Sequence, residues 1–181
     1  NLTNSLCNNL GDCISISSRE LSVDIDILKE YKRKEINLIF NNFQPATQLN
    51  NVDNTTEYII NSILNTAKVL EYFRDASINK IIYTSSSSVY GNNILCNEAD
   101  ALKPMNLHAA LKVSNEKLIE KFCSQHNIDY TIARLFNMYG GNDKFSIISK
   151  LINTAKKNDE ITILNHGNSI RDFIHIDDVV A

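Results

Sequence analysis

Residues 81–91 read IIYTSSSSVYG, and residues 108–112 read HAALK. The β-branched and aromatic run before the serines predicts a short buried strand, since such residues favour strands. The serines then stand at the carboxyl end of that strand, and the apolar spacing around HAALK predicts a helix. His108 and Lys112 are four positions apart, so they share one face of this helix. We therefore expect hydroxyls at a strand end to meet an imidazole and an amino group.

Outward from this stretch, strand-like and helix-like patterns alternate along the chain. Strands are predicted over residues 13–17, 36–40, 80–84, 130–135, 160–164 and 173–176. Helices are predicted over residues 2–10, 24–33, 55–75, 107–125 and 145–157. This alternation indicates an α/β fold, a parallel sheet with helices on both faces. Ligands bind such sheets beyond the carboxyl ends of the strands, where the serines fall.

Composition excludes several classes of protein. The 181 residues suit one domain, and the formal net charge is −3 with scattered basic residues. Nucleic-acid binding usually needs a clustered basic face, so no nucleic-acid partner is expected. No apolar run reaches membrane-spanning length and no signal peptide is recognised, so we expect no membrane association. The ends of the sequence suggest a fragment that begins and stops within elements.

The four cysteines are Cys7, Cys13, Cys96 and Cys123. They show no C-x-x-C spacing and form no cluster with histidine in the sequence. We expect them to be reduced packing residues of a cytoplasmic protein, and we expect no metal site.

Two further motifs follow in order, RLFNMYG at residues 134–140 and SIRDFIHIDDV at residues 169–179. Together with the serine and HAALK segments they resemble the extended short-chain dehydrogenase/reductases, in the sugar-nucleotide-modifying NAD-dependent epimerase/dehydratase family. The resemblance implies a Rossmann-type doubly wound parallel sheet. It also implies a partial NAD(P)-binding domain over residues 1–136, without the first strand and glycine loop. Residues 137–181 would begin a truncated substrate-binding region.

The resemblance implies three catalytic residues. Ser86 would hydrogen-bond the substrate oxygen that undergoes redox, and Lys112 would hold the nicotinamide ribose. His108 stands where the family has its catalytic tyrosine. An imidazole titrates near neutrality, so His108 can still exchange a proton, although the Lys112 charge would lower its pKa. The alternative is that His108 marks a degraded site.

The resemblance also implies a set of cofactor contacts. They are Arg19, Asp24, Ile25, Asn42, Phe43, Gln44, Ser62, Ser85 and Lys112. Arg19 follows the strand predicted over residues 13–17, which corresponds to the family's second strand. NAD-preferring members carry an acid there, and an arginine suits a 2′-phosphate. The cofactor is therefore NAD or NADP, and Arg19 favours NADP. Phe43 and Gln44 are bulkier than the alanines that the family usually has there, and Ser62 replaces its asparagine.

The implied substrate contacts are Ser86, Ser87, Asn137 and Arg171. Asn137 would touch the nucleotide-sugar, and Arg171 would pair with its diphosphate, which a guanidinium binds well. Family dehydratases place an acidic pair where this chain has Ser87 and Ser88, so elimination chemistry lacks its acid and base.

The sequence therefore predicts an NAD(P)-dependent C4 epimerase or keto-sugar reductase for a nucleotide-sugar. The alternative is a degenerate member that binds a nucleotide-sugar or serves as a non-catalytic subunit. The resemblance further implies a homodimer in which the helices predicted over residues 55–75 and 107–125 form a four-helix bundle with their counterparts.

Overall fold

The computed structural model describes residues 2–41 and 54–181, and for residues 164 and 165 it describes the backbone alone. The chain divides into two compact units. One is residues 16–134, and the other joins residues 1–15 to residues 135–181. The predicted domains, residues 1–136 and 137–181, stay a prediction.

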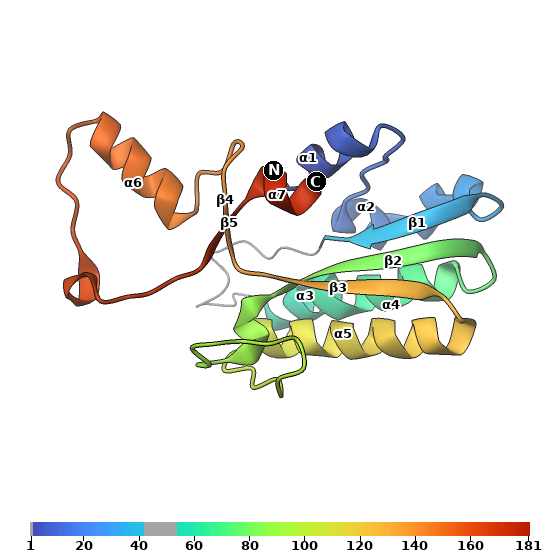
Figure 1. The fold of residues 1–181 in the computed structure, drawn as a ribbon. Coiled ribbons are helices and arrows are strands. Elements are labelled where there is room, and N and C mark those ends of the chain that lie inside the picture. The colour runs from blue at the N-terminus through green and yellow to red at the C-terminus, as the bar shows by residue number, and fades with distance from the viewer. Residues whose placement is uncertain (1, 42–53) are drawn as a thin grey trace. The chain divides into compact units, whose positions relative to one another are not determined.

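A three-stranded sheet forms the centre of the larger unit (Figure 1). Its strands are β1 (Glu35–Phe40), β2 (Ser77–Ser86) and β3 (Asp129–Leu135), in the order β1-β2-β3. Strands β1 and β2 pair in parallel, with Phe40 opposite Tyr83. The helical segments are α2 (Ser18–Val23), a 3-10 helix (Ile25–Tyr31), α3 (Thr55–Ile59), a π-helix (Ile60–Leu64), α4 (Asn65–Tyr72), a 3-10 helix (Ser87–Tyr90) and α5 (Leu107–His126). The predicted α/β fold with a parallel sheet is confirmed.

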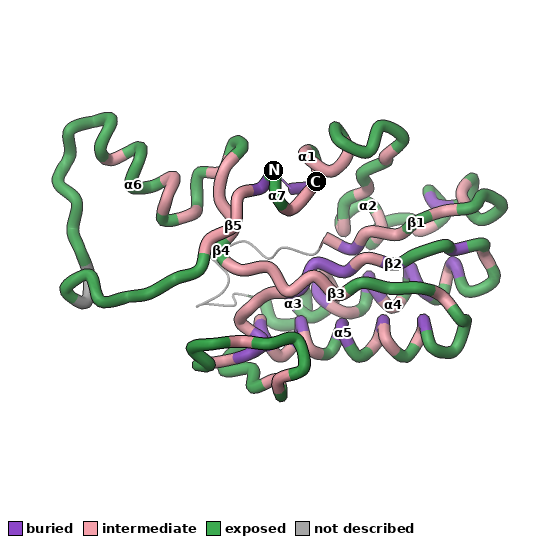
Figure 2. Tube along the Cα trace, viewed as in Figure 1, coloured by how far each residue is buried: buried purple, intermediate pink, exposed green. Residues whose placement is uncertain are grey.

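The hydrophobic core lies between β2 and the inner faces of α4 and α5 (Figure 2). Ile81 and Tyr83 point into it from β2, Phe73 follows α4, and Ile119 comes from α5; all four are at most 1% exposed. Burying one such side chain contributes about 1.5–3 kcal/mol. This packing fixes the register of α5 against β2, and with it the height of Lys112 above the strand.

The smaller unit holds a two-stranded parallel sheet, β4 (Asn137–Tyr139) with β5 (Phe173–His175). Its helices are α1 (Leu2–Leu10), α6 (Ile147–Lys156), a 3-10 helix (Leu164–Gly167) and α7 (Ile176–Val180). Helix α7 lies beside α1, where the Asn9 amide donates to the carbonyl of Val180 (Figure 1). Strand β4 and helix α7 are absent from the sequence prediction.

Two predicted strands are wrong. Residues 13–17 form an irregular segment that ends in the N-cap of α2, where Ser17 and Glu20 close a capping box. The local side-chain bonds of that cap compete with strand pairing. Residues 160–163 are irregular and Leu164 begins a 3-10 helix, while Ile163 is 69% exposed. A segment with alternating apolar residues forms a strand only where another strand lies close enough to pair with it.

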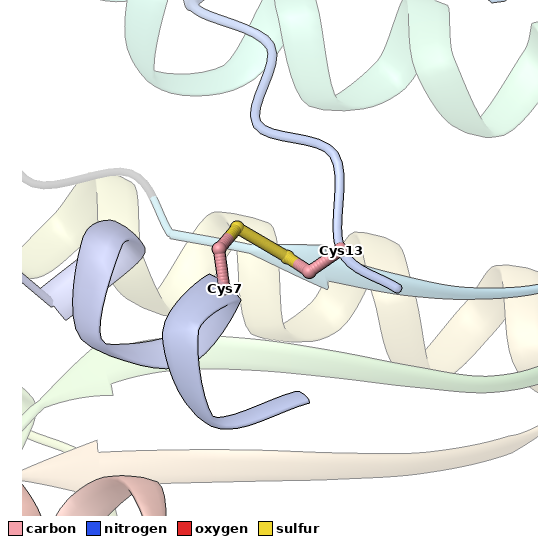
Figure 3. The surroundings of a disulfide bond; sticks show 2 residues. All are labelled: Cys7 and Cys13. Atoms are coloured by element: carbon pink, nitrogen blue, oxygen red, sulfur yellow. A yellow bond between two sulfur atoms is a disulfide. The ribbon is translucent and has the colours of Figure 1, made fainter. Parts of the chain in front are cut away.

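The prediction that all four cysteines are reduced is also wrong, because Cys7 and Cys13 form a disulfide (Figure 3). Gly11 ends α1 with a positive φ of 74°, so the chain turns back and the two Cα atoms lie 4.8 Å apart. Cys96 and Cys123 are free. Cysteine usage therefore no longer supports the predicted cytoplasmic location.

Within residues 2–41 and 54–181, none of the helices is long and apolar enough to cross a membrane. The same residues hold no group of three or more His, Cys, Asp or Glu side chains arranged to hold a metal ion.

Candidate active site

The serine row stands at the carboxyl end of β2, as the sequence predicts. Ser85 is fully buried, and Ser86 caps the 3-10 helix Ser87–Tyr90. The Ser86 hydroxyl oxygen accepts from the Ser88 backbone N–H at 3.2 Å and lies 2.9 Å from the Ser88 hydroxyl. Ser87 is half-buried in the first position of that helix. The cap turns the chain sharply, so the hydroxyl groups gather at the strand end.

Lys112 reaches the same strand end from α5. Its Nζ donates to the carbonyl oxygen of Thr84 at 2.8 Å and lies 5.0 Å from the centre of the Tyr83 ring. Burial lowers the pKa of Lys112 to about 8, although the nearby Glu116 carboxylate opposes that shift. A buried ammonium group is costly and is uncommon outside functional sites.

His108 lies one helical turn before Lys112 on α5 and is half-buried. Burial lowers the pKa of His108, and the positive charge of Lys112 lowers it further. The imidazole is therefore neutral at pH 7 and able to accept a proton. Lys112 thus lies at the carboxyl end of β2, and His108 lies one helical turn from it on α5. A direct approach of Ser86 to His108 stays a prediction.

A buried ion pair behind the serine row was missing from the sequence prediction. Glu116 is fully buried and binds the guanidinium of Arg134, with Oε2 to Nη2 at 2.9 Å. Its Oε1 accepts from the Ser85 hydroxyl. Arg134 also donates to the Tyr90 hydroxyl at 3.0 Å. The i+4 spacing from Lys112 to Glu116 was the available signal, since it places Glu116 on the inner face of α5.

The predicted cofactor contacts lie on several elements. Arg19 is exposed in the first turn of α2, and Asp24 caps the next helix by accepting from the Asp26 backbone N–H at 2.8 Å. Ile25 packs against the core. Ser62 is buried, and its hydroxyl donates to the carbonyl of Tyr58 at 2.6 Å.

Three of the predicted cofactor contacts, Asn42, Phe43 and Gln44, lie outside the described residues. Their part in the site stays a prediction.

The predicted substrate residues of the smaller unit lie near β4 and β5. Asn137 begins β4, and its side-chain amide donates to the carbonyl of Asp172 at 2.7 Å. Arg171 is exposed just before β5. Both stay predicted substrate contacts.

The donors at the end of β2 fit a nicotinamide ribose. An ammonium from Lys112 and hydroxyls from Ser86 and Ser87 suit sugar hydroxyls and a carbonyl oxygen, and the neutral imidazole of His108 suits proton exchange. Groups of these kinds can polarise an oxygen and accept its proton.

A parallel sheet with a polar site at its carboxyl edge defines an α/β protein of the Rossmann type. The sequence profile of the NAD dependent epimerase/dehydratase family matches residues 11–181. The chain belongs to this family, and the resemblance drawn from its motifs is confirmed.

Curated relatives agree with this assignment. Protein CapI of Staphylococcus aureus is 31% identical over 86% of this chain and 48% of its own length. An uncharacterized protein of Methanocaldococcus jannaschii is 34% identical over 86% of this chain and 49% of its own length. The chain thus spans about half the length of these relatives.

Solved structures of 4-epimerases are also similar. UDP-N-acetylglucosamine 4-epimerase from Methanobrevibacter ruminantium superposes with a TM-score of 0.75 at 26% identity, covering 87% of this chain and 53% of that one. A mutant of UDP-glucuronic acid 4-epimerase from Bacillus cereus, in complex with NAD, gives 0.76 at 25% identity over 87% and 51%.

Proposed function

We propose that the full-length protein is an NAD(P)-dependent enzyme that epimerises C4 of a nucleotide-sugar or reduces a keto-sugar. The observation that carries the proposal is the buried Lys112 amino group at the carboxyl end of β2, one helical turn from a neutral imidazole. Two similar structures are those of 4-epimerases, and this supports C4 as the reacting position.

A nicotinamide, when bound, would supply the acceptor and donor of hydride. Ser86 donates a hydrogen bond to the C4 oxygen, and a ring nitrogen of His108 takes the proton of the C4 hydroxyl. The Lys112 ammonium would hold the ribose hydroxyls. Its charge lowers the pKa of His108, so the ring is neutral before it takes the proton. Asn137 would bind the sugar and Arg171 its diphosphate.

Elimination is not proposed, although a dTDP-D-glucose 4,6-dehydratase of Dictyostelium discoideum is 26% identical to the chain. Loss of water from a sugar needs an acid and a base beside the reacting carbons. Ser87 and Ser88, which follow Ser86 directly, have neutral hydroxyls that serve poorly as either.

The experiment that tests the proposed function is turnover of a panel of nucleotide-sugars by the full-length protein, with NAD and NADP each supplied. Inversion at C4, or reduction of a 4-keto sugar, supports the proposal. Failure on every nucleotide-sugar would leave the non-catalytic alternative.

We propose NADP as the preferred dinucleotide. Arg19 is exposed, whereas the neighbouring Glu20 carboxylate accepts from the Ser17 backbone N–H at 2.8 Å and is held in the cap of α2. An exposed guanidinium suits a 2′-phosphate. A similar structure contains NAD, and this observation favours NAD instead. The ratio of the two dissociation constants decides between them.

The substitution His108→Tyr is expected to retain or raise activity, because it restores the phenol that a nearby ammonium can activate. In the native protein the rate should fall only when the pH drops below the ordinary His value of 6.5, since the pKa of His108 is lowered and only the neutral ring accepts a proton. Steady-state rates across pH give both results. His126→Tyr, an exposed change at the far end of α5, is the control. An acid limb unchanged by His108→Tyr would contradict the role of His108.

We also propose a homodimer through the run α3–α4 and helix α5. The π-helical segment of that run contacts α5, and Ile59 and Leu64 are 43% and 41% exposed. Apolar side chains exposed on a helix pair suit a four-helix bundle with a second copy. Light scattering of the full-length protein should give the dimer mass, and a monomer mass would contradict this arrangement.

A further inference from the structure

We propose that Glu116 is a positioning residue, which holds the serine row and Lys112 in place at the end of β2. This inference rests on the proposed function, because it assigns a role within the same site. Glu116 would touch neither substrate nor cofactor. It would act through Ser85, Arg134 and Lys112.

Both carboxylate oxygens of Glu116 are engaged inside the protein. Oε2 accepts from Arg134 Nη2 at 2.9 Å and Nε at 3.3 Å, while Oε1 accepts from Nε at 3.2 Å and from the Ser85 hydroxyl. Ser85 directly precedes Ser86 in the chain. The carboxylate therefore fixes the last buried residue of β2, from which the serine row begins.

Arg134 extends the same network to the chain that follows the serine row. Its Nη1 donates to the Tyr90 hydroxyl and to the Glu98 carbonyl, both at 3.0 Å. Tyr90 ends the 3-10 helix that Ser86 caps. One buried ion pair thus ties together α5, β2, β3 and the turn that carries the serines.

Glu116 also acts on Lys112 through charge. The two residues are one helical turn apart on the inner face of α5, and both are at most 4% exposed. Among the described residues, Lys112 also faces His108 on its own helix, and the Tyr83 ring and Thr84 carbonyl of β2. The negative charge of the Glu116 carboxylate raises the pKa of Lys112 and so opposes the effect of burial.

Stability alone does not account for this arrangement. Replacing a buried ion pair with apolar side chains of similar volume is often neutral or stabilising. The pair at Glu116 and Arg134 lies directly behind a row of candidate catalytic hydroxyls and one turn from the site lysine. Its position matches a role in the site.

The test measures the titration of Lys112 in the full-length protein by NMR. The lysines are labelled at Cε, and the Lys112 signal is the one that is lost in Lys112→Arg. Glu116→Gln keeps the volume and an acceptor for Ser85 but removes the charge. We expect its Lys112 titration midpoint to fall below the native value of about 8. Glu120→Gln is the matched control, because Glu120 lies one turn further along α5 in an exposed pair with Lys117. It should leave the midpoint unchanged.

The measurement needs no turnover, so it stays readable if the proposed function fails. If turnover is found, the alkaline limb of the rate should move to lower pH in Glu116→Gln, since Lys112 then loses its proton earlier. Should Glu116→Gln not fold, the double variant Glu116→Gln/Arg134→Met removes both charges. The Lys112 titration is then measured in that protein instead. A native midpoint in the folded variant would overturn the proposal. So would unfolding of both variants, because the pair would then serve global stability.

Discussion

Arg134→Met is expected to lower the free energy of unfolding of the full-length protein by about 3–5 kcal/mol. In this variant the Glu116 carboxylate loses its charged partner. The Glu116 side chain has no exposed surface, so its charge stays buried and unpaired. Arg134 also holds Tyr90 and the Glu98 carbonyl, so their hydrogen bonds are lost as well. Denaturant unfolding, monitored by circular dichroism, measures the change.

Arg74→Met is the control for this prediction. Arg74 pairs with Glu71 at the end of α4, but the two side chains are 52% and 63% exposed. An exposed pair contributes at most about 1 kcal/mol. Similar losses for the two variants would show that the Glu116 site is wetter and less critical than its burial indicates.

Lys112→Met is expected to have opposite effects on stability and function. The folded protein binds the Lys112 proton with a pKa of about 8, whereas an ordinary lysine has 10.5. Below pH 8 the native protein therefore bears the full cost of the buried charge, and that cost fades as the pH rises toward 10.5. Replacing Lys112 with methionine removes this cost of burying a charge. We expect the free energy of unfolding to rise by about 1–3 kcal/mol at pH 7.

The same substitution should abolish turnover, because the ribose loses its ammonium partner. Lys117→Met changes an exposed lysine on the same helix and should alter neither property. Stability and pH dependence can be compared by thermal melts at pH 7 and pH 10. A Lys112→Met protein that is destabilised at pH 7 would mean that the bond to Thr84 outweighs the cost of burial.

The parts of the site that a local pattern encodes were predictable from sequence. The apolar run of β2 placed Ser85 to Ser88 at a strand end, and helical periodicity placed His108 and Lys112 on one face of α5. Both features depend on residues close together in the chain. The order of the motifs then gave the family, which the sequence profile confirms.

The network around Glu116 could not be predicted with the same methods. Its partners Ser85 and Arg134 lie 31 and 18 positions away in sequence. Only the packing of α5 against β2 and β3 brings them together, and the sequence does not state that packing. The helical spacing of Lys112 and Glu116 could have indicated only that Glu116 faces inward.

The wrong predictions have local physical causes. The alternation at residues 13–17 is that of a strand, but Ser17 and Glu20 instead form a capping box that starts α2. The disulfide between Cys7 and Cys13 depends on the turn at Gly11, which closes a short loop. Spacing rules for metal or redox motifs do not cover such a pair.

The central claim is that this chain builds the nicotinamide site of a nucleotide-sugar enzyme. Calorimetric titration of the full-length protein with NAD and with NADP tests it most directly. We predict saturable binding of at least one dinucleotide, weakened about tenfold or more by Lys112→Met, since a hydrogen bond to a charged group contributes about 1.5–3 kcal/mol. Lys117→Met should bind as the native protein does. No detectable binding of either dinucleotide by the native protein would contradict the account and leave a family member without catalytic function.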